Sequence, residues 1–223
     1  MLSVVIPTLQ AGGTLGATLD AVTAAAGIGE VLVVDAGSTD ATRAIAARAG
    51  ARVIAAPRGR GVQLAAGAAA ATGDWLLFLH ADTVPAPGWD RALAAFIDDP
   101  ASRERAAVFC FALDDPSPAA RRLERWVDWR TRGLGLPYGD QGLLIARDFY
   151  TAVGGFSPMP LMEDVDLARR IGRSRLAVLD AAAVTSAVRY RKEGYMRRGL
   201  RNLVCLSLFF LGVDPKRIER LYR

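Results

Sequence analysis

The chain has 223 residues, of which 52% are hydrophobic and 23% are charged, and its formal net charge is +5. This length and composition fit one globular domain with a sizeable core and exclude a disordered chain. Residues 187–223 hold ten Lys and Arg against three Asp and Glu, whereas residues 1–186 hold 18 against 20. Because the body is nearly neutral, we expect no nucleic-acid partner.

The two cysteines, Cys110 and Cys205, are too few for a disulfide framework or a C-x-x-C metal site, which favours a reducing compartment. Met1 leads directly into an apolar run without a basic segment or a cleavage site. That pattern predicts folded protein rather than a signal peptide. The apolar run 203–213 is about half the ~20 residues of a membrane-spanning helix. We therefore expect a cytoplasmic protein.

Strands and alanine-rich helices alternate through the first hundred residues. The predicted strands are 2–6, 30–35, 51–56 and 74–79, and the predicted helices are 12–26, with Thr14 as its N-cap, 41–49 and 61–72. This alternation predicts an α/β fold, in which a mostly parallel sheet of nucleotide-binding topology is flanked by helices. Farther along we predict a strand at 106–113, a helix at 119–132, a turn at 138–142 and a helix from Glu163 to about Ile171.

Polar residues follow all four strands of the first half, at Pro7-Thr8, 35–40, 57–61 and 80–83. Ligands of open α/β sheets bind at the carboxyl ends of the strands, so these segments predict one cleft for a nucleotide diphosphate. Asp35 can accept the N3–H of a uracil, and Gly37 follows it. The loop with Arg58 and Gly59 offers a guanidinium and close backbone approach to phosphate.

His80 and Asp82 offer an imidazole and a carboxylate at the edge of this cleft, a partial set of ligands for Mg²⁺ or Mn²⁺. Each feature also has a structural interpretation. Asp35 and Asp40 can cap helices, and a lone histidine is more often structural than a ligand. The coincidence of polar groups at four strand ends favours the functional interpretation.

A second acidic cluster, Glu163-Asp164-Val165-Asp166, follows a loop rich in Gly and Pro. These carboxylates either cap the helix that they begin or include a general base. Trp129 and Tyr138 either form the floor of a sugar site or belong to the core. Asp140 and Gln141 can bond the hydroxyls of an acceptor.

Four motifs in this order resemble family 2 glycosyltransferases with the GT-A fold: SVVIPT at 3–8, VVDAGSTD at 33–40, GDWLLFLHADT at 73–83 and MEDVDLARR at 162–170. The HAD at 80–82, the GDQG at 139–142 and the short tail are similar to a compact bacterial subgroup. That subgroup is described as radical-SAM/selenodomain-associated, or of the arsenosugar-biosynthesis type.

The resemblance implies roles for particular residues. Pro7 and Thr8 match the first nucleotide-contacting turn, and Asp35 matches the residue that recognises uracil. Asp82 matches the last residue of the family's D-x-D, which binds the metal and the diphosphate.

The resemblance also makes Asp164 the general base, with Glu163 beside it, and places Arg189 near the diphosphate. The chain departs from the family pattern in two places. His80 replaces the first Asp of D-x-D. In the third helix, Gln63-Leu64-Ala65 stands where the family usually shows Arg-Asn or Gln-Met-Asn, so the amide expected there is missing.

The implied protein is an inverting glycosyltransferase that uses a nucleotide-diphosphate sugar, a UDP-sugar by preference, with Mg²⁺ or Mn²⁺. Its acceptor is a hydroxyl-bearing small molecule or a lipid-linked one. Residues 1–223 form a single domain, with a nucleotide-binding half at 1–100, an acceptor-binding half at 101–186 and a basic helical tail at 187–223.

Two alternatives remain. One is a non-catalytic protein that binds nucleotide sugars or serves as a scaffold, held at the membrane surface. The other concerns the tail, whose apolar and basic residues either lie at the inner face of the membrane or pack on the sheet or on a second subunit.

Overall fold

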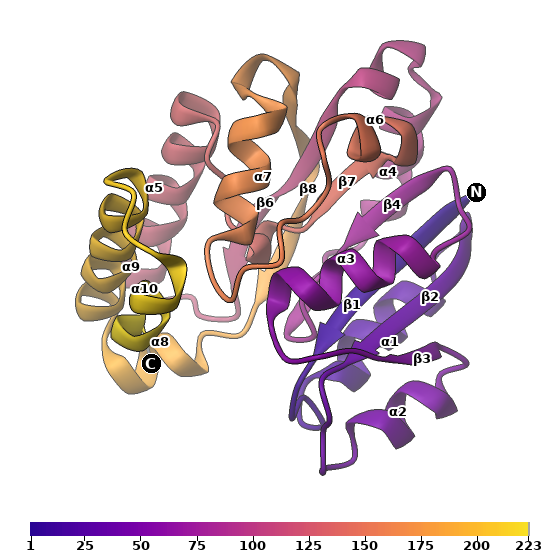
Figure 1. Ribbon diagram of the computed structural model, residues 1–223, viewed down its shortest axis with the longest axis horizontal. Coiled ribbons are helices and arrows are strands. Elements are labelled where there is room, and N and C mark those ends of the chain that lie inside the picture. The colour runs from indigo at the N-terminus through magenta and orange to yellow at the C-terminus, as the bar shows by residue number, and fades with distance from the viewer. Residues whose placement is uncertain (223) are drawn as a thin grey trace.

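The computed structural model describes residues 1–222 and forms a mixed sheet with helices on both faces (Figure 1). The strands are β1 Leu2–Thr8, β2 Ile28–Asp35, β3 Arg52–Ala55, β4 Trp75–Phe78, β5 Thr83–Pro85, β6 Ala106–Leu113, β7 Leu143–Ala146 and β8 Leu176–Thr185. The helices are α1 Leu15–Thr23, α2 Thr42–Arg48, α3 Arg60–Ala70, α4 Trp89–Asp98, α5 Pro118–Leu134, α6 Arg147–Ala152, α7 Glu163–Ile171, α8 Val188–Glu193, α9 Tyr195–Phe210 and α10 Pro215–Tyr222. Short 3-10 turns cover Pro100–Glu104, Gly139–Gln141 and Arg173–Arg175. Arg223, the last residue of the predicted tail, lies outside the described residues.

Within the described chain the strands lie in the order β3-β2-β1-β4-β7-β6-β8-β5. The pairs β1–β2, β2–β3, β1–β4 and β6–β8 are parallel, and β4–β7, β6–β7 and β5–β8 are antiparallel. Because β7 runs against both of its neighbours, β1, β4, β6 and β8 all point toward one edge of the sheet. The predicted mostly parallel sheet flanked by helices is confirmed.

The centre of the sheet is buried on both faces, as expected for near-continuous apolar strands. All four residues of β4 are buried, and α3 crosses in front of β1 and β2 while α1 lies behind them (Figure 1). Gly67 of α3 allows a close approach, because a Cβ atom there would lie 2.3 Å from Cγ1 of Val5 and 2.9 Å from Cγ2 of Val34. This tight seam holds α3 against β1 and β2, and the Gln63 amide near the start of α3 donates to the Thr8 carbonyl at the carboxyl end of β1.

The predicted elements of the first half are present, with ends that differ by a few residues. Thr14 does precede α1, but its hydroxyl donates to the carbonyl of Ala11 instead of capping the helix. The sequence analysis did not predict β5, β7, β8, α4 or α6. Two of these, β5 and β7, have three and four residues, too few to show a period.

The tail forms α8, α9 and α10, which gather beside α5 at one end of the molecule (Figure 1). Cys205 and Leu206 on the inner face of α9 are buried with Val165 of α7 and Ile218 of α10. On the outer face, Met196 remains 89% exposed. Among residues 1–222, no helix has the length and hydrophobicity needed to cross a membrane.

Two glycines inside helices allow the α3 seam to be tested with a matched control. Gly67→Ala would place a methyl group against Val5 and Val34, whereas Gly199→Ala in α9 meets nothing within 4 Å. Both substitutions gain the same helix propensity, up to about 1 kcal/mol. We expect Gly199→Ala to raise the free energy of unfolding and Gly67→Ala to lower it by roughly 1–3 kcal/mol in urea titrations. Equal effects of the two substitutions would show that the seam is not tight.

Candidate functional site

Two adjoining hollows lie at the carboxyl ends of the parallel strands. The first, the β1 cleft, is lined by Pro7, Thr8, Gln10, Arg58, Gly59 and Gln63, among others. The second, the central cavity, is lined by Tyr138, Asp140, Met162, Asp164, Tyr190, Arg198 and Asn202, among others. They share Arg60, His80, Asp82, Ser186 and Arg189. One continuous site therefore extends from the end of β1 to the tail helices.

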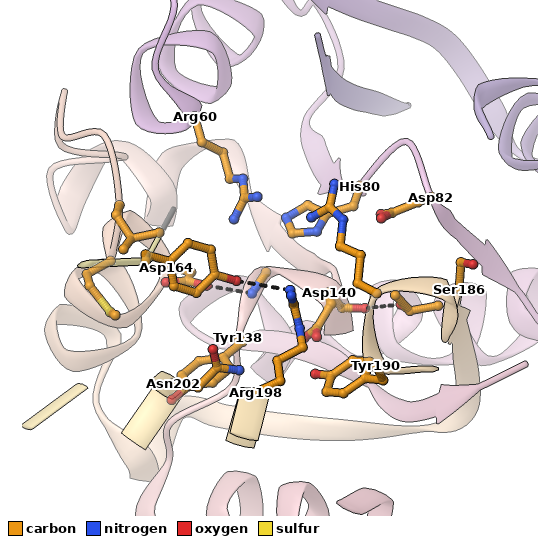
Figure 2. Close-up of a pocket in the computed structure, with 16 residues that line it drawn as sticks. Arg60, His80, Asp82, Tyr138, Asp140, Asp164, Ser186, Tyr190, Arg198 and Asn202 are labelled. Atoms are coloured by element: carbon orange, nitrogen blue, oxygen red, sulfur yellow. Dashed lines mark hydrogen bonds between the residues drawn. The ribbon is translucent and has the colours of Figure 1, made fainter. Parts of the chain in front are cut away.

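Three motifs that lie far apart in the sequence meet at Gly139. Its backbone N–H donates to Oδ2 of Asp164 at 2.7 Å. A Cβ atom on Gly139 would lie 2.6 Å from Nε2 of His80 and 3.4 Å from Oδ2 of Asp164, so no other residue fits without displacing one of them. Figure 2 shows His80, Asp140 and Asp164 around the same cavity. The structure therefore brings these three predicted residues together in one cavity.

Asp164 is held at the start of α7 by backbone groups on both sides. Its Oδ1 accepts from the N–H of Val165 at 2.7 Å, while its Oδ2 accepts from Gly139. Met162, the residue directly before α7, has φ 69°, in the left-handed region that non-glycine residues seldom adopt. Such a conformation costs on the order of 1–2 kcal/mol and is typical of functional sites. The strained turn presents Asp164 to the central cavity.

Glu163 is buried next to Asp164 and does not line the central cavity. Its side chain is 1% exposed, neither carboxylate oxygen has a hydrogen-bond partner, and Oε1 lies 3.6 Å from Nε of Arg60. Burial raises the pKa of Glu163 to about 7, opposed by Arg60 and reinforced by Asp164. The structure thus gives Glu163 a position that supports Arg60 and Asp164 and does not face a ligand.

Asp140 and Tyr138 form the floor of the cavity. Burial raises the pKa of Asp140 to about 6, with Arg130 opposing the shift, and its Oδ1 is buried without a partner. The Arg130 guanidinium lies 3.5 Å from the centre of the Tyr138 ring. Buried polar atoms normally have a hydrogen-bond partner, so the free Oδ1 of Asp140 is available to a ligand in the cavity.

His80 is neutral in this setting. Burial, followed by the positive charges of Arg60 and Arg189, keeps the pKa of its imidazole well below the ordinary value. A neutral imidazole beside the Asp82 carboxylate can ligate a divalent cation. Among residues 1–222 no cluster of three or more potential metal ligands exists, so a cation here would need further oxygens from a ligand or from water.

Asp35 and Gln63 are occupied by the chain itself. The Asp35 carboxylate accepts from Thr8 Oγ1 at 3.1 Å, Gly37 N at 3.1 Å and Ser38 N at 2.9 Å, and also from the Ser38 hydroxyl. Burial opposes ionisation, but these bonds outweigh it and lower the pKa of Asp35. The Gln63 amide lines the β1 cleft but donates to the carbonyls of Thr8 and Val34, both at 2.8 Å, so the backbone occupies its N–H groups.

Several predicted residues lie outside both hollows. Asp35 and Gly37 shape the loop beside the β1 cleft without lining it. Trp129 is 58% exposed and lines a separate surface groove near Cys110, away from the central cavity. Gln141 is also outside the cavity lining, because it is buried and bonded to Phe109 O and Thr131 Oγ1. Its amide fixes the turn and does not face the cavity.

Other residues of the central cavity were not singled out as site residues from the sequence. These residues are Arg60, Ser186, Tyr190, Arg198, Asn202 and Tyr222. Arg60 lies in the basic loop after the third strand, and the charge of that loop indicates a phosphate contact. The tail residues gave no such signal, because only the folding of α8, α9 and α10 against α7 brings them to the cavity.

Comparisons with known proteins identify the family and the fold. Residues 3–139 match the model of the family described as Glycosyl transferase family 2. No curated protein sequence matches the chain significantly. Among solved structures, glucosyl-3-phosphoglycerate synthase from Mycobacterium tuberculosis with Mn²⁺, UDP-glucose and phosphoglyceric acid has a TM-score of 0.65 at 20% identity. That match covers 96% of this chain and 80% of the synthase.

A second structure of that enzyme, with Mn²⁺, UDP and glucosyl-3-phosphoglycerate, has a TM-score of 0.61 at 22% identity. It covers 83% of this chain and 70% of the synthase. At such identities the likeness shows the fold, which is the GT-A fold.

Glu163 predicts a specific pH dependence of stability. Folding raises its pKa from 4.5 to about 7, so between these values the folded chain keeps a proton that the unfolded chain loses. The free energy of unfolding should therefore fall as the pH rises from about 4.5 to 7, by ~3 kcal/mol from this group. Asp140 acts in the same direction between 3.8 and about 6.

Glu163→Gln should flatten this fall, whereas Glu104→Gln, at an exposed position, should keep the wild-type slope. Urea titrations at a series of pH values measure both. The same slope in Glu163→Gln and the wild type would contradict the placement of Glu163.

Proposed function

The chain belongs to glycosyltransferase family 2, and from that premise we propose that it transfers a sugar, with inversion, from a nucleotide-diphosphate donor to an acceptor hydroxyl. One observation carries the proposal: the 2.7 Å bond from Gly139 N–H to Asp164 Oδ2. It holds a carboxylate suited to proton abstraction in the cavity that also contains His80 and Asp82. The proposed base, metal and nucleotide positions then lie in one continuous site.

The β1 cleft is the proposed donor site. Arg58, Arg60 and Arg189 line it and offer guanidinium groups for a diphosphate, with the backbone of Pro7, Thr8 and Gly59 close by. The similar synthase structures contain UDP or UDP-glucose, which supports a UDP-sugar as the donor. Asp35 would recognise the uracil edge. The N3–H of uracil would then compete with the Ser38 hydroxyl for the Asp35 carboxylate.

Asp82 and neutral His80 are the residues that would hold Mg²⁺ or Mn²⁺. Two protein ligands suit a cation that completes its coordination with substrate phosphates and water. When bound, the cation would offset the negative charge that develops on the leaving diphosphate. The similar synthases contain Mn²⁺ in their crystals, which supports this choice.

Asp164 is the proposed general base. It takes the proton of the acceptor hydroxyl while that oxygen bonds to the anomeric carbon. The bond from this carbon to the diphosphate oxygen breaks on the opposite face, and its electron pair leaves with the nucleoside diphosphate. Arg60 and Arg189 stabilise that charge. Glu163 positions Arg60 and Asp164 from behind and does not touch the substrates.

The resemblance also leads us to propose four finer properties of the protein. These are the radical-SAM-associated subgroup, transfer of a hexose, a lipid-linked acceptor, and contact of the tail with a membrane or a second copy of the chain. The exposed Met196 side of α9 is the surface that would make such a contact.

Asp164→Asn tests the base. The amide carbonyl can still accept from Gly139 N–H, but it cannot take a proton, so turnover of a UDP-sugar should fall by roughly 10²–10⁴-fold while UDP affinity stays the same. Asp166→Asn is the control, because Asp166 lies on the same helix but lines neither hollow: it pairs with Arg170 and accepts from the Ser157 hydroxyl of the preceding loop. Wild-type turnover in Asp164→Asn would refute the assignment. UDP binding without any turnover in the wild type would favour a binding or scaffold protein.

Removal of divalent cations tests the metal site. EDTA should reduce turnover by roughly 100-fold or more, and Mn²⁺ should restore it. Asp82→Asn should raise the Mn²⁺ concentration needed for half-maximal turnover, whereas Asp90→Asn in the first turn of α4 should not. Full activity in EDTA would show that the arginines alone neutralise the leaving group.

A further inference from the structure

An unbalanced cluster of charges lies at the tail side of the central cavity, which one of its members, Arg198, lines. Arg198 and Arg201, both on α9, pair with the same carboxylate, Glu193 of α8. Arg198 Nη1 lies 3.1 Å from Glu193 Oε1, and Arg201 bonds the other oxygen. Two guanidinium groups on one carboxylate leave an excess of one positive charge.

The excess charge is buried and its donors are not all used. Arg198 is only 7% exposed, and its guanidinium lies 5.0 Å from the centre of the Tyr190 ring and 3.2 Å from the Tyr222 hydroxyl. The Nε atoms of Arg198 and Arg201 are buried without hydrogen-bond partners, and so is Oδ1 of Asn202. A buried charge with unsatisfied donors is costly unless a partner completes it.

The cluster faces the proposed reaction centre. In Figure 2, Tyr190, Arg198 and Asn202 lie at one end of the cavity, and Arg60 and His80 lie at the other. Asp140 and Asp164 lie between these two groups. A molecule with its hydroxyl at Asp164 can therefore reach Arg198 with its other end. Because Arg198 is buried, it cannot meet a flat lipid surface.

We propose that Arg198, with Asn202 beside it, binds an anionic group of the acceptor, a phosphate or a carboxylate. The proposal rests on the proposed function, because it takes the central cavity as the acceptor site. The Arg198 guanidinium would donate its free Nε–H to the anion, and the free Oδ1 of Asn202 would accept from a hydroxyl of the same acceptor molecule. The acceptor class is thus a hydroxyl compound that carries a negative charge, rather than a neutral sugar or polyol.

Calorimetry on the full chain saturated with UDP and Mn²⁺ tests this, because UDP fills the diphosphate site. The probes are inorganic phosphate, acetate and uncharged glycerol. We expect saturable binding of phosphate or acetate and none of glycerol. Arg198→Gln should weaken the anion by roughly 10-fold or more, as expected for loss of a charged hydrogen bond. Arg197→Gln removes the same charge from the exposed neighbouring position and should bind as the wild type does.

A second variant keeps the test valid if Arg198→Gln does not fold. Asn202→Asp leaves Arg198 and its pair with Glu193 in place but adds a negative charge, and it should abolish anion binding. Circular dichroism checks the fold of both variants. A short-chain phosphatidic acid, titrated in the same way, distinguishes a lipid-linked phosphate from a free one.

Three results would overturn the inference: no saturable binding of either anion, equal loss in Arg197→Gln and Arg198→Gln, or competition between phosphate and UDP. The last would place the anion on the donor diphosphate site. If UDP itself fails to bind, the proposed function falls, and the same titrations on the unliganded chain still report whether Arg198 binds an anion.

Discussion

The site depends on one hydrogen bond, from the backbone N–H of Gly139 to the Asp164 carboxylate at 2.7 Å. The turn that carries Gly139 and the strained start of α7 meet there beside the end of β4. Position 139 also requires glycine, because the Cβ atom of any larger residue would collide with His80. Because three distant segments converge on one atom, the position of the proposed base is linked to that of the proposed metal ligands.

Charge is the second constraint on the site. The central cavity contains the carboxylates Asp82, Asp140 and Asp164 opposite the guanidinium groups Arg60, Arg189 and Arg198. This balance lets a nearly neutral body receive a charged donor. It also changes the meaning of the basic tail, because Arg189 and Arg198 supply part of the positive charge of the site and are not merely surface charges. The outer face of α9, with Met196 exposed, remains separate from that role.

Much of the site could be predicted from sequence, because strand ends and acidic motifs are local patterns. For that reason the sequence identifies as candidates His80, Asp82, Asp140 and Asp164, all of which line the central cavity. The direction of side chains and the packing of distant segments could not be predicted, because local patterns do not encode them. Trp129 belongs to the predicted helix but faces outward, and the Gln141 amide is consumed by its own turn. Arg198 became part of the site only through contacts between α8, α9 and α10.

Hydrolysis of a donor in the absence of an acceptor tests the central claim most directly. The measurement is proton NMR of the anomeric signal of free sugar, released from a panel of α-linked UDP-sugars with Mn²⁺ present. If water takes the place of the acceptor hydroxyl at Asp164, the first sugar released should be the β anomer, before mutarotation. Release of the α anomer first, or no release from any donor while UDP binds, would contradict the account.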